Sequence, residues 1–183
     1  MSMKNHKKNE RTKIFEELDV QSRPIKINEM PRRIDLCQKA LTIISREMEP
    51  DLWAMLQDDL ATNLMQSPIG PRAENIEAAI QHFEQALEVR DRQRFPEEWA
   101  STLNNLATAY RDRIRGERAE SIEKAINCYH EALEVRTHKE YRKDWAMTQF
   151  NLAGAYYKRI RGTRAENLEC AIQHSHRALK VYT

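Results

Sequence analysis

The stretch that decides the fold is Trp99–Asp144, which reads WASTLNNLATAYRDRIRGERAESIEKAINCYHEALEVRTHKEYRKD and has a copy on either side. Trp53, Trp99 and Trp145 follow one another at intervals of 46 residues, and an Ala follows each Trp. Residues 145–183 are identical to residues 99–137 at 23 of 39 positions, without a gap. A period of this length is typical of a stacked array of repeats and not of a single compact globule.

Each copy contains two segments with apolar residues at helical spacing, separated by turn residues. The pattern predicts a helix that begins near Pro50 and is stopped by the segment Gln66–Pro71, and further helices over about 72–91, 96–115, 118–136, 142–161 and 164–181. Gly116 and Gly162 fit the left-handed position just past a helix end. Ala107 and Ala153 recur in the first helices, and Ala125 and Ala171 in the second, where small residues let helix backbones approach closely.

The same register divides the chain into a short N-terminal region and an array. Residues 1–28 are expected to form a tail, disordered over 1–8, with a short capping helix at Asn9–Leu18 and a break near Pro24. The array spans 29–183, as a half repeat at 29–49 and repeats at 50–95, 96–141 and 142–183. The three tryptophans are expected to pack between repeats.

Composition narrows the function classes. Thirty basic and 28 acidic residues give a formal net charge of +2, and this near balance argues against a dedicated nucleic-acid binder. Cys37, Cys128 and Cys170 show no CxxC spacing, so we expect reduced thiols, no zinc site and a cytoplasmic protein. No apolar run approaches the length of a membrane span, and the basic N-terminus lacks the apolar stretch of a secretory signal.

The order of small and large residues resembles the tetratricopeptide repeat. Leu106-Ala107-x-x-Tyr110 is followed by Ala125-x-x-x-Tyr129-x-x-Ala132, and similar sets occur in the other two copies. The resemblance implies an all-α fold, an α-solenoid of helix hairpins wound as a right-handed superhelix, with no enzymatic activity and no cofactor. The family repeat has about 34 residues, so this chain carries a longer form. Leu103 stands at the usual family Trp position, and Gln57 and Gln149 do so in the other copies.

The phrases W-A-x-T and R-I-R-G-x-R-A-E are similar to repeats that precede caspase-like CHAT protease domains in cyanobacterial and related bacterial proteins. This second resemblance implies an alternative function, as the regulatory or sensory portion of a CHAT protease system. No protease domain is recognisable in the chain.

The tetratricopeptide resemblance implies a concave groove that binds a peptide or helix of a partner protein. The groove positions, hereafter the first-helix stripe, are Met55, Asp58, Thr62, Met65, Ser101, Asn104, Thr108, Arg111, Met147, Phe150, Gly154 and Tyr157. These residues vary between the copies while the expected core residues do not. Their Met and aromatic content favours an apolar helix or extended peptide.

Basic residues cluster at the turns between paired helices. They are Arg113, Arg115, Arg118, Lys158, Arg159, Arg161 and Arg164. They could hold an acidic partner or a nucleic-acid backbone, which makes a nucleic-acid-binding solenoid a further alternative. We favour a structural role, because arginines at helix C-termini bond free carbonyls and offset the helix dipole.

Other chemistry-bearing residues point to no active site. Cys128 with His130, and His174 with His176, stand two apart, so the members of each pair lie on different helix faces. The last predicted helix leaves an apolar face at Ala171, Ala178 and Leu179, which indicates an interface. Two explanations stay open: the array continues in a longer protein, or the chain forms a homodimer through this end.

Overall fold

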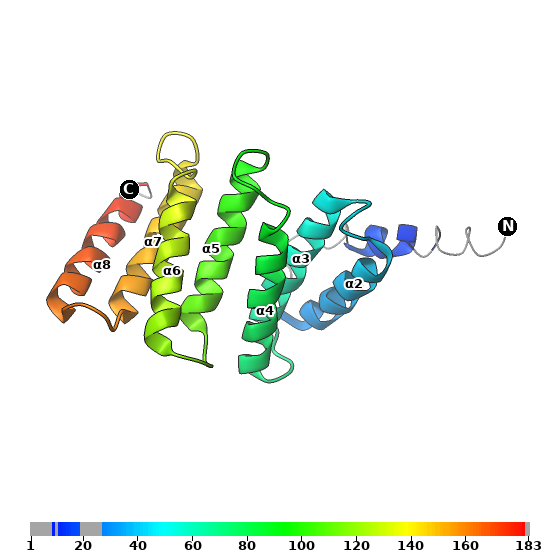
Figure 1. Ribbon diagram of the computed structural model, residues 1–183, viewed down its shortest axis with the longest axis horizontal. Helices are drawn as coiled ribbons and strands as arrows, with labels where there is room; N and C mark the ends of the chain where they lie inside the picture. Colours follow the sequence, from blue (N-terminus) through cyan, green and yellow to red (C-terminus); the bar gives the residue numbers. More distant parts are fainter. Residues whose placement is uncertain (1–8, 10, 19–26, 182–183) are drawn as a thin grey trace. The chain divides into compact units, whose positions relative to one another are not determined.

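The computed structural model describes residues 9, 11–18 and 27–181, and within this part of the chain it contains helices and no strand (Figure 1). The chain divides into two compact units, Met1–Val89 and Arg90–Thr183. The division falls in the connection between the first two predicted full repeats.

The first unit begins with a short helix at residues 11–18, followed by a 3-10 turn, η1, at Ile27–Glu29. Three α-helices follow: α2 at Met30–Ile43, α3 at Pro50–Gln66 and α4 at Arg72–Leu87. The helix α3 packs against both α2 and α4. The predicted disorder of residues 1–8 and the predicted break around Pro24 lie outside the described residues.

The second unit consists of two helical hairpins. They pair α5 (Pro96–Asp112) with α6 (Arg118–Leu133), and α7 (Arg142–Lys158) with α8 (Arg164–Leu179). The helix α7 packs against α6, so the second hairpin rests on the first (Figure 1). The prediction of an all-α solenoid of helix hairpins is confirmed. The sense of the superhelix and the repeat boundaries stay predictions.

The six helices of the three repeats begin where the sequence predicts them, and α3 ends at the predicted stop, whereas α4 to α8 end two to four residues earlier than predicted. The helix α5 ends at Asp112 and not at Arg115, because Arg113 leaves it in an extended conformation, with ψ 133°. Gly116 has a positive φ of 76°, as predicted. It lies within the connection between α5 and α6, however, and not at the position directly after α5. The prediction of a glycine directly past the helix end is therefore wrong. A Cβ at this φ would strain the turn.

Small side chains build the core of each hairpin, and a buried aromatic residue of the second helix joins them in the first two, as the repeated positions predict. Ala107, Ala125 and Ala132 are fully buried beside Tyr129, and Phe83 takes the corresponding position in the first unit. The Tyr129 hydroxyl lies 2.9 Å from Thr108 Oγ1 on α5. Burial raises the pKa of Tyr129 to about 12, so this phenol stays protonated.

We expect Tyr129→Phe to lower the free energy of unfolding by about 1 kcal/mol, because Thr108 loses its cross-helix partner while the ring still fills the core. Urea unfolding followed by circular dichroism measures the change. Tyr157→Phe, at an exposed ring, is the control and should stay within about 0.5 kcal/mol of the wild type. Equal effects of the two variants would contradict the role of the buried hydroxyl.

The tryptophans are half-buried and lie against the connections that precede their own repeats. The guanidinium of Arg46 lies 5.8 Å from the ring centroid of Trp53, and that of Arg92 lies 5.9 Å from Trp99. The ring of His138 meets Trp145 edge-on at 4.9 Å. In the first two cases the arginine also pairs with a glutamate after the second helix of the repeat. Each tryptophan therefore packs against the connection before its own repeat. The sequence predicted a broader contact, between one repeat and the next.

The N-terminal helix contacts the first unit through both apolar and charged groups. Ile14 and Leu18 are buried. Arg11 donates two hydrogen bonds, of 2.9 and 2.7 Å, to the Glu49 carboxylate. The side chain of Arg33, on α2, donates to the carbonyl of Leu18 at 3.4 Å. These contacts join the N-terminal helix to α2 and to the connection before α3; its role as a cap of the array stays a prediction.

Candidate partner-binding site

The first-helix stripe differs in character from helix to helix. On α3, Met55 is exposed, whereas Asp58, Thr62 and Met65 are half-buried. On α5 the positions are Ser101, Asn104, Thr108 and Arg111, which are polar and largely engaged within the unit.

The α5 positions make contacts inside the second unit. Asn104 is buried, and its Oδ1 accepts a hydrogen bond of 3.2 Å from Asn151 of α7. Thr108 contacts Tyr129 of α6. Arg111 donates to Asp112 at 3.2 and 3.3 Å. Asn104 therefore offers little accessible surface to a ligand, whereas the side chains of Ser101, Thr108 and Arg111 are partly exposed.

The α7 positions form an apolar stripe that faces solvent. Phe150 is 66% exposed and Tyr157 is 59% exposed, and Met147 is also exposed. With Gly154, they recur at a spacing of three and four residues and so share one face of the helix. Large apolar side chains on one exposed face are the usual mark of a binding surface.

A hollow of about 680 Å³ opens beside this stripe. Phe150, Gly154 and Tyr157 of α7 line it together with Arg111 of α5. A Cβ added at Gly154 would lie 3.6 Å from a guanidinium nitrogen of Arg111, so the glycine lets the cation approach α7 closely. The structure thus gathers four stripe residues from two helices around one concavity.

The other wall of the hollow comes from α8, which the first-helix stripe does not include. Its lining residues there are Leu168, Ala171, Ile172, Ser175, His176 and Leu179. Ile172 and Leu179 are exposed, whereas Ala171 and Ala178 are buried. The predicted exposed face is thus correct at Leu179 and wrong at the two alanines, because α7 covers them. The period of 46 residues could have identified Ile172, since it corresponds to the core residue Ile126.

One family model matches a segment of the chain. Residues 99–138 match the family model of the tetratricopeptide repeat. The matched segment contains α5 from Trp99 onward and all of α6. No curated protein and no solved structure matched the chain. Tetratricopeptide repeats generally mediate protein–protein interactions; the resemblance to CHAT-associated repeats stays a prediction.

Two of the three tetratricopeptide-like hairpins contain a hydrogen-bonded His–Gln pair at equivalent positions, half-buried in the first repeat and buried in the last. His82 Nδ1 lies 2.6 Å from Gln57 Oε1, and His174 Nδ1 lies 2.5 Å from Gln149 Oε1. In the middle repeat, the same two positions hold Leu103 and Cys128. Each His–Gln hydrogen bond joins the first helix of its repeat to the second. The middle repeat has an apolar side chain and a thiol at these positions, in place of that hydrogen bond.

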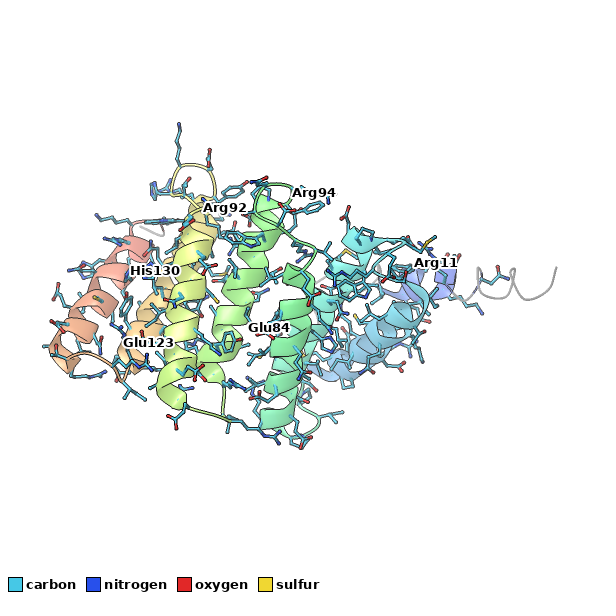
Figure 2. The ribbon with its side chains drawn as sticks, viewed as in Figure 1. Arg11, Glu84, Arg92, Arg94, Glu123 and His130 are labelled. Atoms are coloured by element: carbon cyan, nitrogen blue, oxygen red, sulfur yellow. The ribbon has the colours of Figure 1, made fainter. Side chains whose placement is uncertain are left out.

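The pair in the last repeat belongs to a cluster of rings. Tyr156 stacks on His174 with centroids 5.4 Å apart. His130 of α6, which is labelled in Figure 2, meets both rings edge-on. Desolvation, with smaller effects of Arg177 and His130, lowers the pKa of His174 to about 4. Burial also lowers the pKa values of His82 and His130. These imidazoles are therefore neutral near pH 7.

The basic residues at the turns are used largely inside the protein. Arg118 donates to the carbonyl of Arg113 at 2.9 Å, and Arg164 donates to that of Tyr157 at 2.5 Å. Arg72 makes the equivalent bond to Met65 in the first repeat. These bonds satisfy carbonyls at the ends of first helices, which is the structural role favoured from the sequence.

Two further basic residues of this set tie α7 to the preceding hairpin. Arg159 donates two hydrogen bonds, of 2.8 and 2.9 Å, to Glu123 of α6, which is labelled in Figure 2. These bonds lower the pKa of the Glu123 carboxyl. Lys158 Nζ lies 3.2 Å from Asp112 Oδ1. Charge at this end of the helices therefore fixes the register of one hairpin on the next.

The described residues offer no group of three or more His, Cys, Asp or Glu that could hold a metal ion. Cys37 is buried, whereas Cys128 and Cys170 are half-buried, and all three are free thiols. None of the helices in the described ranges has the length and apolar content needed to cross a bilayer.

Proposed function

We propose that this chain is a non-catalytic, cytoplasmic scaffold that binds a peptide or helix of a partner protein on the α5 and α7 residues of the first-helix stripe. The single observation that carries the proposal is the solvent-exposed apolar stripe of Met147, Phe150 and Tyr157 beside the hollow. A protein leaves large apolar side chains clustered on one face chiefly where another molecule covers them. The family match supports the same general role.

The shape and chemistry of this surface favour an apolar ligand with an acidic group. Aromatic rings and Met supply adaptable apolar contact, and Arg111 stands at the edge of the hollow. A nucleic-acid ligand has less support, because Arg118, Arg159 and Arg164 are held by carbonyl and carboxylate groups of the protein.

The test compares partner capture by the wild type and by the double variant Phe150→Ala, Tyr157→Ala. We expect capture of the specific partner, identified by mass spectrometry, to fall at least about tenfold, because aromatic anchors dominate such interfaces. Ile114→Ala, Ile160→Ala is the matched control, since it removes two equally exposed apolar side chains from the interhelical connections. Unchanged recovery with the aromatic double variant would contradict the proposal.

A further inference from the structure

The open side of the last hairpin is equivalent, by the period of 46 residues, to the surface on which α7 rests. We define this end face by Leu168, Ile172, Ser175 and Leu179 of α8 with Phe150 of α7. The corresponding residues of the middle repeat are Ile122, Ile126, Tyr129, Leu133 and Asn104. In that repeat α7 packs on α6. The end face therefore repeats an interface that the molecule itself already displays.

Burial shows the difference that the covering helix makes. Ile126 is 4% exposed beneath α7, whereas Ile172, the same residue type one period later, is 52% exposed. Leu168 is half-buried, whereas Ile122 is completely buried. Within the described ranges, this side of α8 has apolar groups arranged to receive a helix and no helix lying over them.

Two substitutions adapt the end face to a bulkier apolar occupant. Ser175 stands where Tyr129 fills the core of the middle repeat, which helps to make room for the hollow of about 680 Å³. Phe150 replaces Asn104, whose amide bonds Asn151 of α7. The polar contact that α7 makes there is thus replaced by an aromatic one.

Charged groups of the end face determine which residues fit at the C-terminal end of a bound helix. In the observed interface, Lys158 and Arg159 of α7 meet Asp112 and Glu123, respectively. One period later the receiving residues are Lys158 and Glu169. The complementary helix therefore ends with an acidic residue followed by a basic one, and a helix ending in two basic residues is disfavoured at the first position.

We propose that the end face binds an amphipathic α-helix that has the apolar face of a first helix and a carboxylate-then-cation pair in its last turn. This chain contains both chemistries for comparison, because the last residue of α5 and the residue after it are Asp112 and Arg113, and those of α7 are Lys158 and Arg159. This inference rests on the proposed function and deepens it, because the end face is the α8 wall of the same hollow and shares Phe150 with the first-helix stripe.

The experiment uses the full chain and two fluorescein-labelled peptides with blocked ends, residues 96–115 and residues 142–161, in fluorescence anisotropy titrations. We expect residues 96–115 to bind with a Kd on the order of 10–100 µM, since an isolated helix must also be ordered on binding. Residues 142–161 should bind about threefold more weakly, which is the size expected for one partly exposed charge pair. Lys158→Glu in the protein should reverse this preference.

Ile172→Asp should weaken binding of both peptides at least about tenfold, because it places a charge in the middle of the apolar contact. Ile114→Asp is the matched control, at an exposed isoleucine outside the hollow, and should leave binding unchanged. Because both isoleucines are exposed, neither variant is expected to unfold the chain.

Three results would overturn the inference: no saturable binding of either peptide, binding that Ile172→Asp leaves intact, or a peptide preference that Lys158→Glu does not change. Sedimentation of the chain alone supplies a fourth. A dimer that Ile172→Asp converts to a monomer would assign the end face to a second copy instead. Partner capture that depends on Phe150 and Tyr157 but not on Ile172 would leave the proposed function standing without this surface.

Discussion

Lowering the pH from about 7 to about 4.5 is expected to cost the second unit about 2 to 3 kcal/mol of stability through His174 alone. The pKa of this imidazole is about 4 in the folded protein, against 6.5 for the ordinary group. The folded state therefore binds its proton less readily than the unfolded state does. The stabilisation is complete above pH 6.5 and is lost as the pH falls toward 4.

The sign follows from the surroundings of the ring. His174 is buried at the α7–α8 contact, stacked on Tyr156, near His130 and the cation of Arg177. None of these groups stabilises a positive charge on the His174 ring beside the charge of Arg177. The lowered pKa values of His82 and His130 act in the same direction, so acid should weaken both units.

The chain supplies its own control for this effect. The double variant Gln149→Leu, His174→Cys places the pair found in the middle repeat, Leu103 with Cys128, into the last one. Urea midpoints measured from about pH 7 to 4.5 should fall less steeply for this variant than for the wild type. His174→Cys alone should be less stable at neutral pH, because Gln149 then keeps a buried amide without its partner. Parallel pH profiles for the wild type and double variant would refute the assignment.

Replacing Glu97 by Ala is expected to destabilise the second unit by about 2 to 3 kcal/mol, because it leaves the buried guanidinium of Arg136 without its carboxylate. The side chain of Arg136 is 3% exposed and donates to Glu97 Oε1 at 2.9 and 3.3 Å. A third bond, of 3.3 Å, reaches Thr148 of α7. Arg136 lies just after α6. Its hydrogen bonds therefore join the connection between α6 and α7 to the two first helices, α5 and α7.

A second substitution separates the buried charge from ordinary packing. In Glu97→Ala, Arg136→Met both charges are gone and an apolar side chain replaces the stem of the arginine, so at least half of the lost stability should return. Asp35→Ala is the control, because the Asp35–Lys39 pair is exposed and should contribute about 0.5 kcal/mol or less. Denaturant midpoints measure all three. Additive effects of the two substitutions at Glu97 and Arg136 would show that the pair is not coupled.

The repeat pattern was sufficient to predict which segments are helical and which helices pair. Alanines at fixed positions, aromatic residues opposite them and prolines at helix starts act locally, within one hairpin, and the same local pattern recurs every 46 residues. Helix ends were less well predicted, since Arg113 and Arg159 leave the helices in an extended conformation that the spacing of apolar residues does not encode.

The exposure of equivalent residues depended on their neighbours in space. Ile126 and Ile172 have the same side chain and the same place in their repeats, yet one is buried and the other is half in solvent. Arg136 is charged and lies after the end of α6, yet its side chain is buried and makes three hydrogen bonds. Periodicity identifies the face of a helix that prefers contact with other residues. Only the packed chain determines whether another helix lies against that face, because burial is a property of both surfaces together.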